Sequence, residues 1–135
     1  MMIASSTFLR RVLAADAVAS AGAGLLFALG GAQLQALAGL PAEISQPMGA
    51  FLVGYAAVVG WIASRSVVRA ALVWAVVLVN LLWAVESIVL LSGEFLRPTL
   101  LGQGLVFGQA AAVAAFAILE MLGLRRSPRL ADRPA

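Results

Sequence analysis

Four long apolar stretches dominate the chain, and short polar segments separate them. The apolar stretches cover residues 12–29, 48–63, 70–91 and 99–122. A transmembrane helix needs about 20 mainly apolar residues to cross a hydrocarbon core of roughly 30 Å. The pattern therefore predicts an all-α membrane protein in which four transmembrane helices form an antiparallel up-down bundle.

The polar connections differ in length. Residues 64–69 and 92–98 allow only tight turns, so the spans that they join are expected to be antiparallel neighbours. Residues 30–46 form a longer connection, in which leucines recur every three residues. This spacing predicts a short helix over residues 32–40 that lies on the membrane surface. Pro47 is expected in the first turn of the second span.

The division into domains is simple. Residues 1–124 are expected to form one transmembrane domain. Residues 125–135 are polar, basic and interrupted by proline, which predicts a disordered cytoplasmic tail. The first apolar stretch also has features of a cleaved signal peptide, because Arg10 and Arg11 precede it. Asp16 inside the apolar stretch argues against a leader, so we interpret this stretch as a span.

All basic residues are arginines, and they gather on one side of the predicted membrane. All but Arg97 lie before the first span, between the second and third spans, or in the tail. The positive-inside rule therefore predicts that both termini are cytoplasmic. Because a composition rich in arginine and alanine suggests a GC-rich bacterial source, the expected location is a bacterial inner membrane, in which the lipid bilayer is the surrounding partner.

The composition excludes several classes of protein. Hydrophobic residues make up 63% of the chain and charged residues only 11%, far outside the range of soluble proteins. The net charge of +3 does not indicate a nucleic-acid-binding face, because no soluble domain is present to carry one. The chain has no cysteine and no histidine, which removes thiol chemistry and the usual metal and haem ligands. We expect no catalytic residues, no metal and no cofactor.

Glu86 is the carboxylate expected deepest in the outer half of the membrane. It shares one face of the third span with Asn80 and Trp83. Two interpretations stay open. Glu86 is either a neutral acid hydrogen-bonded to Gln103, Tyr55 or a backbone carbonyl, or a titratable ligand site for which Trp83 and Tyr55 supply aromatic walls.

Two further carboxylates, Asp16 and Glu120, are expected at similar depth near the cytoplasmic side. A structural network of ion pairs is the first interpretation, and a proton relay or ligand site is the second. The arginines at this level are Arg11, Arg65, Arg69 and Arg125.

Two other features concern helix packing. Asn80 and Gln109 are expected to meet near the midplane and to hydrogen-bond between helices. Gly104 and Gly108 form a GxxxG pattern in the fourth span, which allows close approach of another helix. That helix belongs either to the same bundle or to a second copy in a homodimer.

The segment RRVLAADAVASAGAG in the first span and the pattern RALVW...N..WAVES in the third resemble the uncharacterised four-span integral membrane proteins of bacteria. The resemblance extends over the whole chain and implies a fold and a location, with no functional residues. Small multidrug-resistance transporters have a similar length and a carboxylate in the first span. Here Asp16 lies close to the cytoplasmic edge, and Glu86 with Trp83 is on the third span instead.

These observations support two hypotheses on function. The first is a non-enzymatic accessory, assembly or partner-binding subunit that acts within the bilayer, since the short loops leave no room for a soluble site. The alternative is a small proton-coupled transporter or lipophilic-ligand binder that uses Glu86. No nucleophile and base pair supports an enzyme.

Overall fold

The computed structural model describes residues 1–94 and 96–130, and within them the chain forms five helices and a small two-stranded sheet. The long helices are α1 (Thr7–Leu29), α3 (Ala42–Ser64), α4 (Ala70–Ser92) and α5 (Leu100–Arg125). Each of them is long and apolar enough to cross a membrane. The prediction of four membrane-spanning helices is confirmed to that extent.

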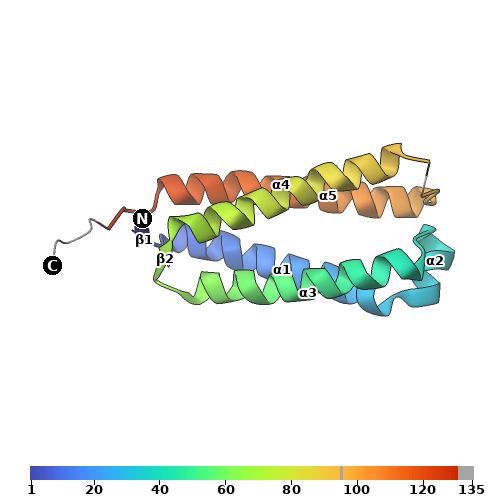
Figure 1. Ribbon diagram of the computed structural model, residues 1–135, viewed down its shortest axis with the longest axis horizontal. Helices are drawn as coiled ribbons and strands as arrows, with labels where there is room; N and C mark the ends of the chain where they lie inside the picture. Colours follow the sequence, from blue (N-terminus) through green and yellow to red (C-terminus); the bar gives the residue numbers. More distant parts are fainter. Residues whose placement is uncertain (95, 131–135) are drawn as a thin grey trace.

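The four long helices run side by side, with different elements at the two ends of the bundle (Figure 1). The strands β1 (Met2–Ala4) and β2 (Val67–Arg69) lie at one end, and the short helix α2 (Gly31–Ala38) lies at the other. We refer to these as the strand end and the α2 end. Helix α2 matches the short helix that the leucine spacing predicted.

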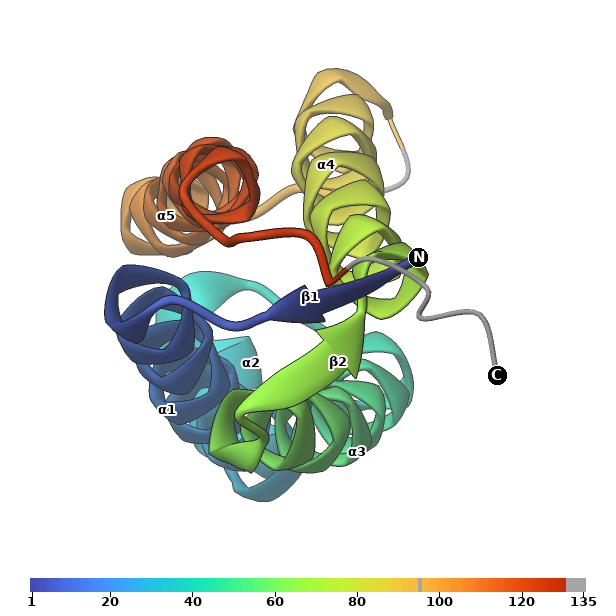
Figure 2. The same ribbon diagram turned by 90° about the vertical axis from the view of Figure 1, so that its left-hand side faces the viewer.

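The bundle consists of two helix pairs. Helix α1 packs along α3, and α4 packs along α5, as the end-on view shows (Figure 2). The pairs are joined mainly through α1 and α5, whereas α3 and α4 scarcely touch although they follow one another in the sequence. The side of the bundle between α3 and α4 is therefore the least tightly closed.

Glycines explain the close approach of α1 and α3. A Cβ atom on Gly49 would overlap the backbone of Ala28 and lie 2.6 Å from the carbonyl oxygen of Gly24. A Cβ atom on Gly24 would in turn lie 2.9 Å from the Cβ of Leu52. The two helices are thus in near backbone contact where they cross, which is how membrane helices gain van der Waals contact without a hydrophobic driving force.

The predicted GxxxG seam on α5 makes no such contact among residues 1–94 and 96–130. A Cβ atom on Gly104 or Gly108 would meet nothing within 4 Å. The nearby Gly102 is the close-packed glycine instead, because its α-carbon faces the backbone of Ala38 in α2. The internal alternative for the seam was therefore wrong, and the homodimer stays a prediction.

Two helices begin earlier than predicted. Helix α1 begins at Thr7, where the Ser6 hydroxyl accepts a hydrogen bond from the Leu9 N–H at 3.1 Å. Helix α3 begins at Ala42, which moves Pro47 out of the first turn into the second. The apolar pattern did not predict these starts, because the residues before each span are polar. A helix can extend beyond the hydrocarbon core and carry polar side chains there.

The strand end is more ordered than the sequence indicated. Strand β1 pairs antiparallel with β2, so that Ile3 lies opposite Val68. The Ala4 N–H donates to the Pro128 carbonyl at 2.9 Å, and the Leu130 N–H donates to the Met2 carbonyl at 3.0 Å. The predicted disorder of the tail is wrong up to residue 130, since these backbone groups pair with one another. Residues 131–135 lie outside the described residues.

The distribution of polar and apolar side chains is the reverse of that in a soluble protein. Large apolar side chains are widely exposed, among them Leu29 at 79% and Leu100 at 85%. Asp16, Asn80 and Glu120 are buried at 0%, 2% and 0% exposure. Exposed apolar surface on this scale requires a lipid environment, so the protein is a multi-pass membrane protein.

Replacing Gly49 with alanine is expected to lower the free energy of unfolding by about 1–3 kcal/mol, because the added methyl group overlaps the α1 backbone. Gly54 lies on the same helix and is a matched control, since a Cβ atom there meets nothing within 4 Å. The Gly54→Ala change is expected to alter stability by less than about 0.5 kcal/mol. Unfolding of the purified variants in detergent measures the difference, and equal stabilities would contradict the close crossing.

Candidate functional site

Five polar side chains meet inside the bundle and come from all four long helices. We call them the polar cluster: Asp16 and Ser20 from α1, Tyr55 from α3, Asn80 from α4 and Glu120 from α5. Both carboxylates are fully buried. Burial of a carboxylate in a bundle surrounded by lipid is costly unless it is paired or hydrogen-bonded, so the contacts within the cluster decide its chemistry.

Asn80 is the centre of the polar cluster. Its Nδ2 donates to Asp16 Oδ2 at 3.0 Å and to Glu120 Oε2 at 3.3 Å. Its Oδ1 accepts from the Tyr55 hydroxyl at 3.0 Å. A side-chain amide has two N–H donors and a carbonyl oxygen with two lone pairs, so Asn80 makes three of its four possible hydrogen bonds here and uses both donors. One amide group therefore holds both carboxylates.

The two carboxylates receive unequal numbers of donors. Asp16 accepts from Asn80 and from the Ser20 hydroxyl at 3.0 Å, and its Oδ2 lies 3.1 Å from the Tyr55 hydroxyl, whose one hydrogen is shared between Asp16 and Asn80. Glu120 accepts only the longer bond from Asn80, and its Oε1 is buried without a partner. The Asp16 carboxyl thus has more hydrogen-bond donors around it than the Glu120 carboxyl, which keeps one oxygen without a partner.

The direction of the helices explains why these side chains converge. Helix α4 starts at the strand end and α5 finishes there (Figure 1). Because Cα–Cβ bonds tilt toward the N-terminus of a helix, the Asn80 side chain leans toward the strand end and the Glu120 side chain leans away from it. The two side chains therefore approach each other from different levels of the bundle.

The arginines that were expected to pair with these carboxylates lie elsewhere. Arg11, Arg65, Arg69 and Arg125 are all exposed at the strand end. The Arg65 guanidinium lies 4.9 Å from the centre of the Trp61 ring instead. Within residues 1–94 and 96–130, no arginine forms an ion pair with Asp16 or Glu120. The prediction of ion pairs was wrong because α1 begins earlier and α5 ends later than expected, which places both carboxylates deeper in the bundle.

Glu86 and Trp83 lie outside the polar cluster. The Glu86 side chain is exposed, and it makes no hydrogen bond to Gln103 or Tyr55 in the described part of the chain. Tyr55 belongs to the polar cluster. Gln103 is exposed near the α2 end, where its Nε2 donates to the Pro98 carbonyl at 3.4 Å. The proposed neutral acid with these two partners is therefore wrong, since the side chains point in different directions.

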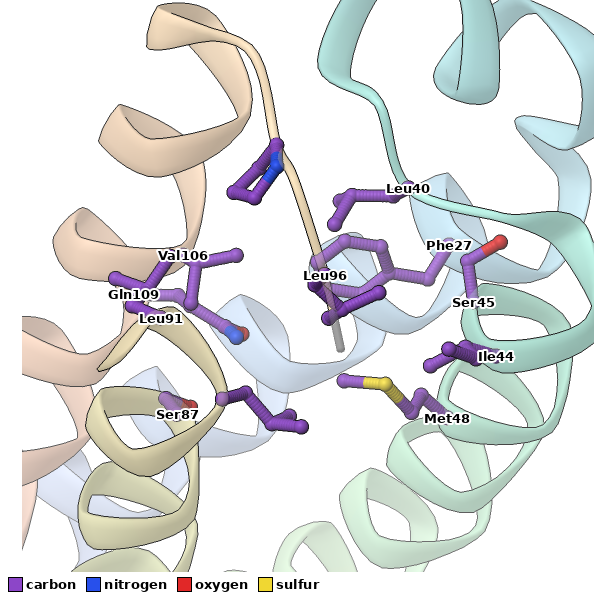
Figure 3. Close-up of a pocket in the computed structure, with 12 residues that line it drawn as sticks. Phe27, Leu40, Ile44, Ser45, Met48, Ser87, Leu91, Leu96, Val106 and Gln109 are labelled. Carbon is purple, nitrogen blue, oxygen red and sulfur yellow. The ribbon is translucent and has the colours of Figure 1, made fainter. Parts of the chain in front are cut away.

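Gln109 also has a different position from the one predicted. It does not bond to Asn80, and its Nε2 is buried without a partner. Figure 3 shows its side chain at an apolar cavity near the α2 end, which Phe27 and Val106 also line. The expected hydrogen bond between Asn80 and Gln109 does not form, because both N–H donors of Asn80 bond to the two carboxylates.

A crevice between α1 and α5 reaches the polar cluster. It has a volume of about 80 Å³, and its polar lining consists of Asp16, Ser20 and Gln109. Ala19 and Ala112, which lie at its border, are exposed on the outer surface of the bundle. The crevice therefore lies between the outer surface of the bundle and the buried Asp16.

The sequence contained part of the signal for this site. Asp16 and Ser20 are one turn apart on α1 and share a face, and Glu120 was placed at the level of Asp16. What the sequence did not provide was the register of α4 against α1 and α5, which brings Asn80 between them. Tyr55 was assigned to the wrong carboxylate for the same reason.

No protein-family model, curated protein or solved structure matches this chain, so the site is interpreted from its own geometry. The site consists of two buried carboxylates that accept hydrogen bonds from one amide, together with one tyrosine hydroxyl and one serine hydroxyl. Among residues 1–94 and 96–130, no group of three or more metal-ligating side chains occurs.

Replacing Asn80 with alanine is expected to lower the free energy of unfolding by about 1–3 kcal/mol, because both carboxylates lose a donor inside the bundle. Replacing the exposed Gln103 with alanine is the control and is expected to change stability by less than about 0.5 kcal/mol. Unfolding in detergent compares the two. If Asn80→Ala proved as stable as the control, the central role of this amide would be refuted.

Proposed function

We propose that this protein is a small proton-coupled carrier or lipophilic-ligand binder, in which the polar cluster is the proton-binding site. The supporting observation is that Asp16 and Glu120, both fully buried, accept hydrogen bonds from the same nitrogen of Asn80. Two adjacent negative charges without a basic partner are strongly unfavourable in a medium of low dielectric constant. One bound proton removes one of the charges.

The geometry favours a proton over a metal cation. The Asn80 side chain directs its N–H groups, not its carbonyl oxygen, at both carboxylates. These donors occupy the space in which a cation would have to lie and would repel it. A proton on Glu120 needs no additional space, and the unpartnered Oε1 is the atom available to hold it.

The crevice between α1 and α5 suggests how a ligand meets the proton. Its lining is mostly apolar, with Leu52, Val113 and Phe116 beside Asp16. A lipophilic molecule with one protonatable group fits this lining, since its apolar part can stay in the crevice while the polar group exchanges a proton with the polar cluster. Glu86, which the sequence favoured for this role, lies on a different surface.

We also propose an up-down bundle with both termini in the cytoplasm of a bacterium. The exposed arginines Arg11, Arg65, Arg69 and Arg125 gather at the strand end, and the positive-inside rule assigns that end to the cytoplasm. The α2 end then lies on the outer side of the inner membrane.

The orientation can be tested by labelling, because the chain contains no native cysteine. Gln35→Cys on α2 is expected to react with a membrane-impermeant maleimide in intact spheroplasts. Ser66→Cys, beside β2, is expected to react only after the membrane is permeabilised. The reverse pattern would overturn the proposed orientation.

The proton site can be tested with Glu120→Gln and Asp16→Asn in nanodiscs and proteoliposomes. The wild-type protein is expected to show the infrared C=O band of a buried carboxylic acid, which Glu120→Gln removes. Both variants are expected to lose ligand-driven proton flux by about tenfold or more, because the bound proton is required for coupling. The exposed Glu43 gives the control, since Glu43→Gln removes a carboxylate outside the polar cluster.

An unchanged band and unchanged flux in Glu120→Gln and Asp16→Asn would overturn the proton-coupled role. The accessory or partner-binding role expected from the sequence is the second candidate. It is favoured by the Gly104 and Gly108 face, which is exposed and packs against nothing in the described part of the chain. Co-purification of a membrane partner that Gly108→Leu removes would support that role.

A further inference from the structure

A second crevice lies on the opposite side of the bundle, between α3 and α4. It has a volume of about 130 Å³ and is lined by Met48 from α3 and by Trp83, Glu86, Ser87 and Leu90 from α4. Figure 3 shows Met48 extending from α3 toward the side on which Ser87 lies. The crevice exists because α3 and α4 scarcely touch along their lengths.

Glu86 is the only acidic residue that lines this crevice, and it has no partner within the described part of the chain. Its side chain is exposed on a helix surface that is otherwise apolar, with Leu82, Val85 and Val89 as exposed neighbours. It lies about a turn and a half before the end of α4. A carboxylate at this depth that faces lipid is costly and requires a counter-charge from outside the chain.

Trp83 is the aromatic residue that lines the crevice. Its ring stacks on Phe51 of α3, with centroids 5.7 Å apart and an interplanar angle of 4°. The Phe51 ring stacks in turn with Tyr55 at 6.3 Å. This stack bridges α3 and α4 and holds the Trp83 ring, which lines the crevice together with Glu86. The indole Nε1 of Trp83 is buried and has no hydrogen-bond partner in the described residues.

We propose that this crevice binds an amphipathic organic cation, such as a substituted ammonium or phosphonium ion. Glu86 supplies the negative charge, the Trp83 ring supplies a cation–π contact, and Met48 and Leu90 cover the apolar substituents. The concave site gives the charged centre of a cation and part of its substituents more contact than the flat side of a helix would. This site is separate from the polar cluster and does not depend on the proposed proton coupling.

Binding of tetraphenylphosphonium to the full chain tests the proposal, measured by equilibrium dialysis in detergent micelles. Triphenylphosphine oxide is the neutral probe of similar shape. Glu86→Gln is expected to weaken binding of the cation about tenfold or more, and Trp83→Leu about three- to thirtyfold. Neither change is expected to affect the neutral probe by more than about twofold.

Glu94→Gln is the matched control, because Glu94 is another exposed acidic residue near the end of α4 and lies outside the crevice. It is expected to leave binding of the cation unchanged. Equal binding of the cation by Glu86→Gln and the wild type would overturn the proposal. A change in oligomeric state in Glu86→Gln without loss of cation binding would also overturn it and would assign this face to a second copy of the chain.

Circular dichroism and gel filtration show whether each variant is folded. Glu86→Gln is nearly isosteric at an exposed position, so it is expected to fold like the wild type. Fluorescence gives a second readout in a background with Trp61→Phe and Trp74→Phe, in which Trp83 is the remaining tryptophan. Tetraphenylphosphonium is expected to quench this emission by a saturable process, and quenching that does not saturate would contradict a defined site.

Discussion

The bilayer offers no water to a buried polar group, and this constraint organises the interior of the protein. Every donor and acceptor in the core needs a partner from the chain itself. The side-chain amide of Asn80 satisfies two carboxylates and one hydroxyl at once. These groups come from four helices, so the same bonds that solvate Asp16 also fix how the helices face one another. The Oε1 of Glu120 is one of the buried atoms without a partner in the described residues, and it is the atom that we propose to hold a proton.

The two sides of the bundle differ in how closely their helices pack. Small residues bring α1 and α3 into near backbone contact through Gly24 and Gly49, which leaves little space between these helices. Helices α3 and α4 lack such contact, and the stacked rings of Phe51 and Trp83 bridge them instead. Rings span a wider gap than glycines do. The loosely closed side between α3 and α4 therefore carries a crevice.

The environment decides what each carboxylate can do. Asp16 has donors from Asn80 and Ser20 and shares the Tyr55 hydroxyl with Asn80, Glu120 has one donor, and Glu86 has none within the described residues. The three carboxyl groups therefore have different surroundings, and we propose a different role for each of them. These roles follow from the number of donors and the direction of the side chain, because the surrounding medium supplies neither donors nor screening.

The sequence by itself determined the class of protein and the four long helices, because the length of an apolar stretch and the thickness of a bilayer are local and fixed quantities. It also showed which polar and charged residues cost free energy when they are placed in a membrane. The tertiary structure alone decided which of them meet. Helix α1 starts and α5 ends a few residues beyond the predicted spans. Asp16 and Glu120 therefore lie deeper in the bundle than predicted, near Asn80 and not near the arginines. That register depends on contacts such as Gly49 against Ala28, which are distant in the sequence and carry no periodic signal.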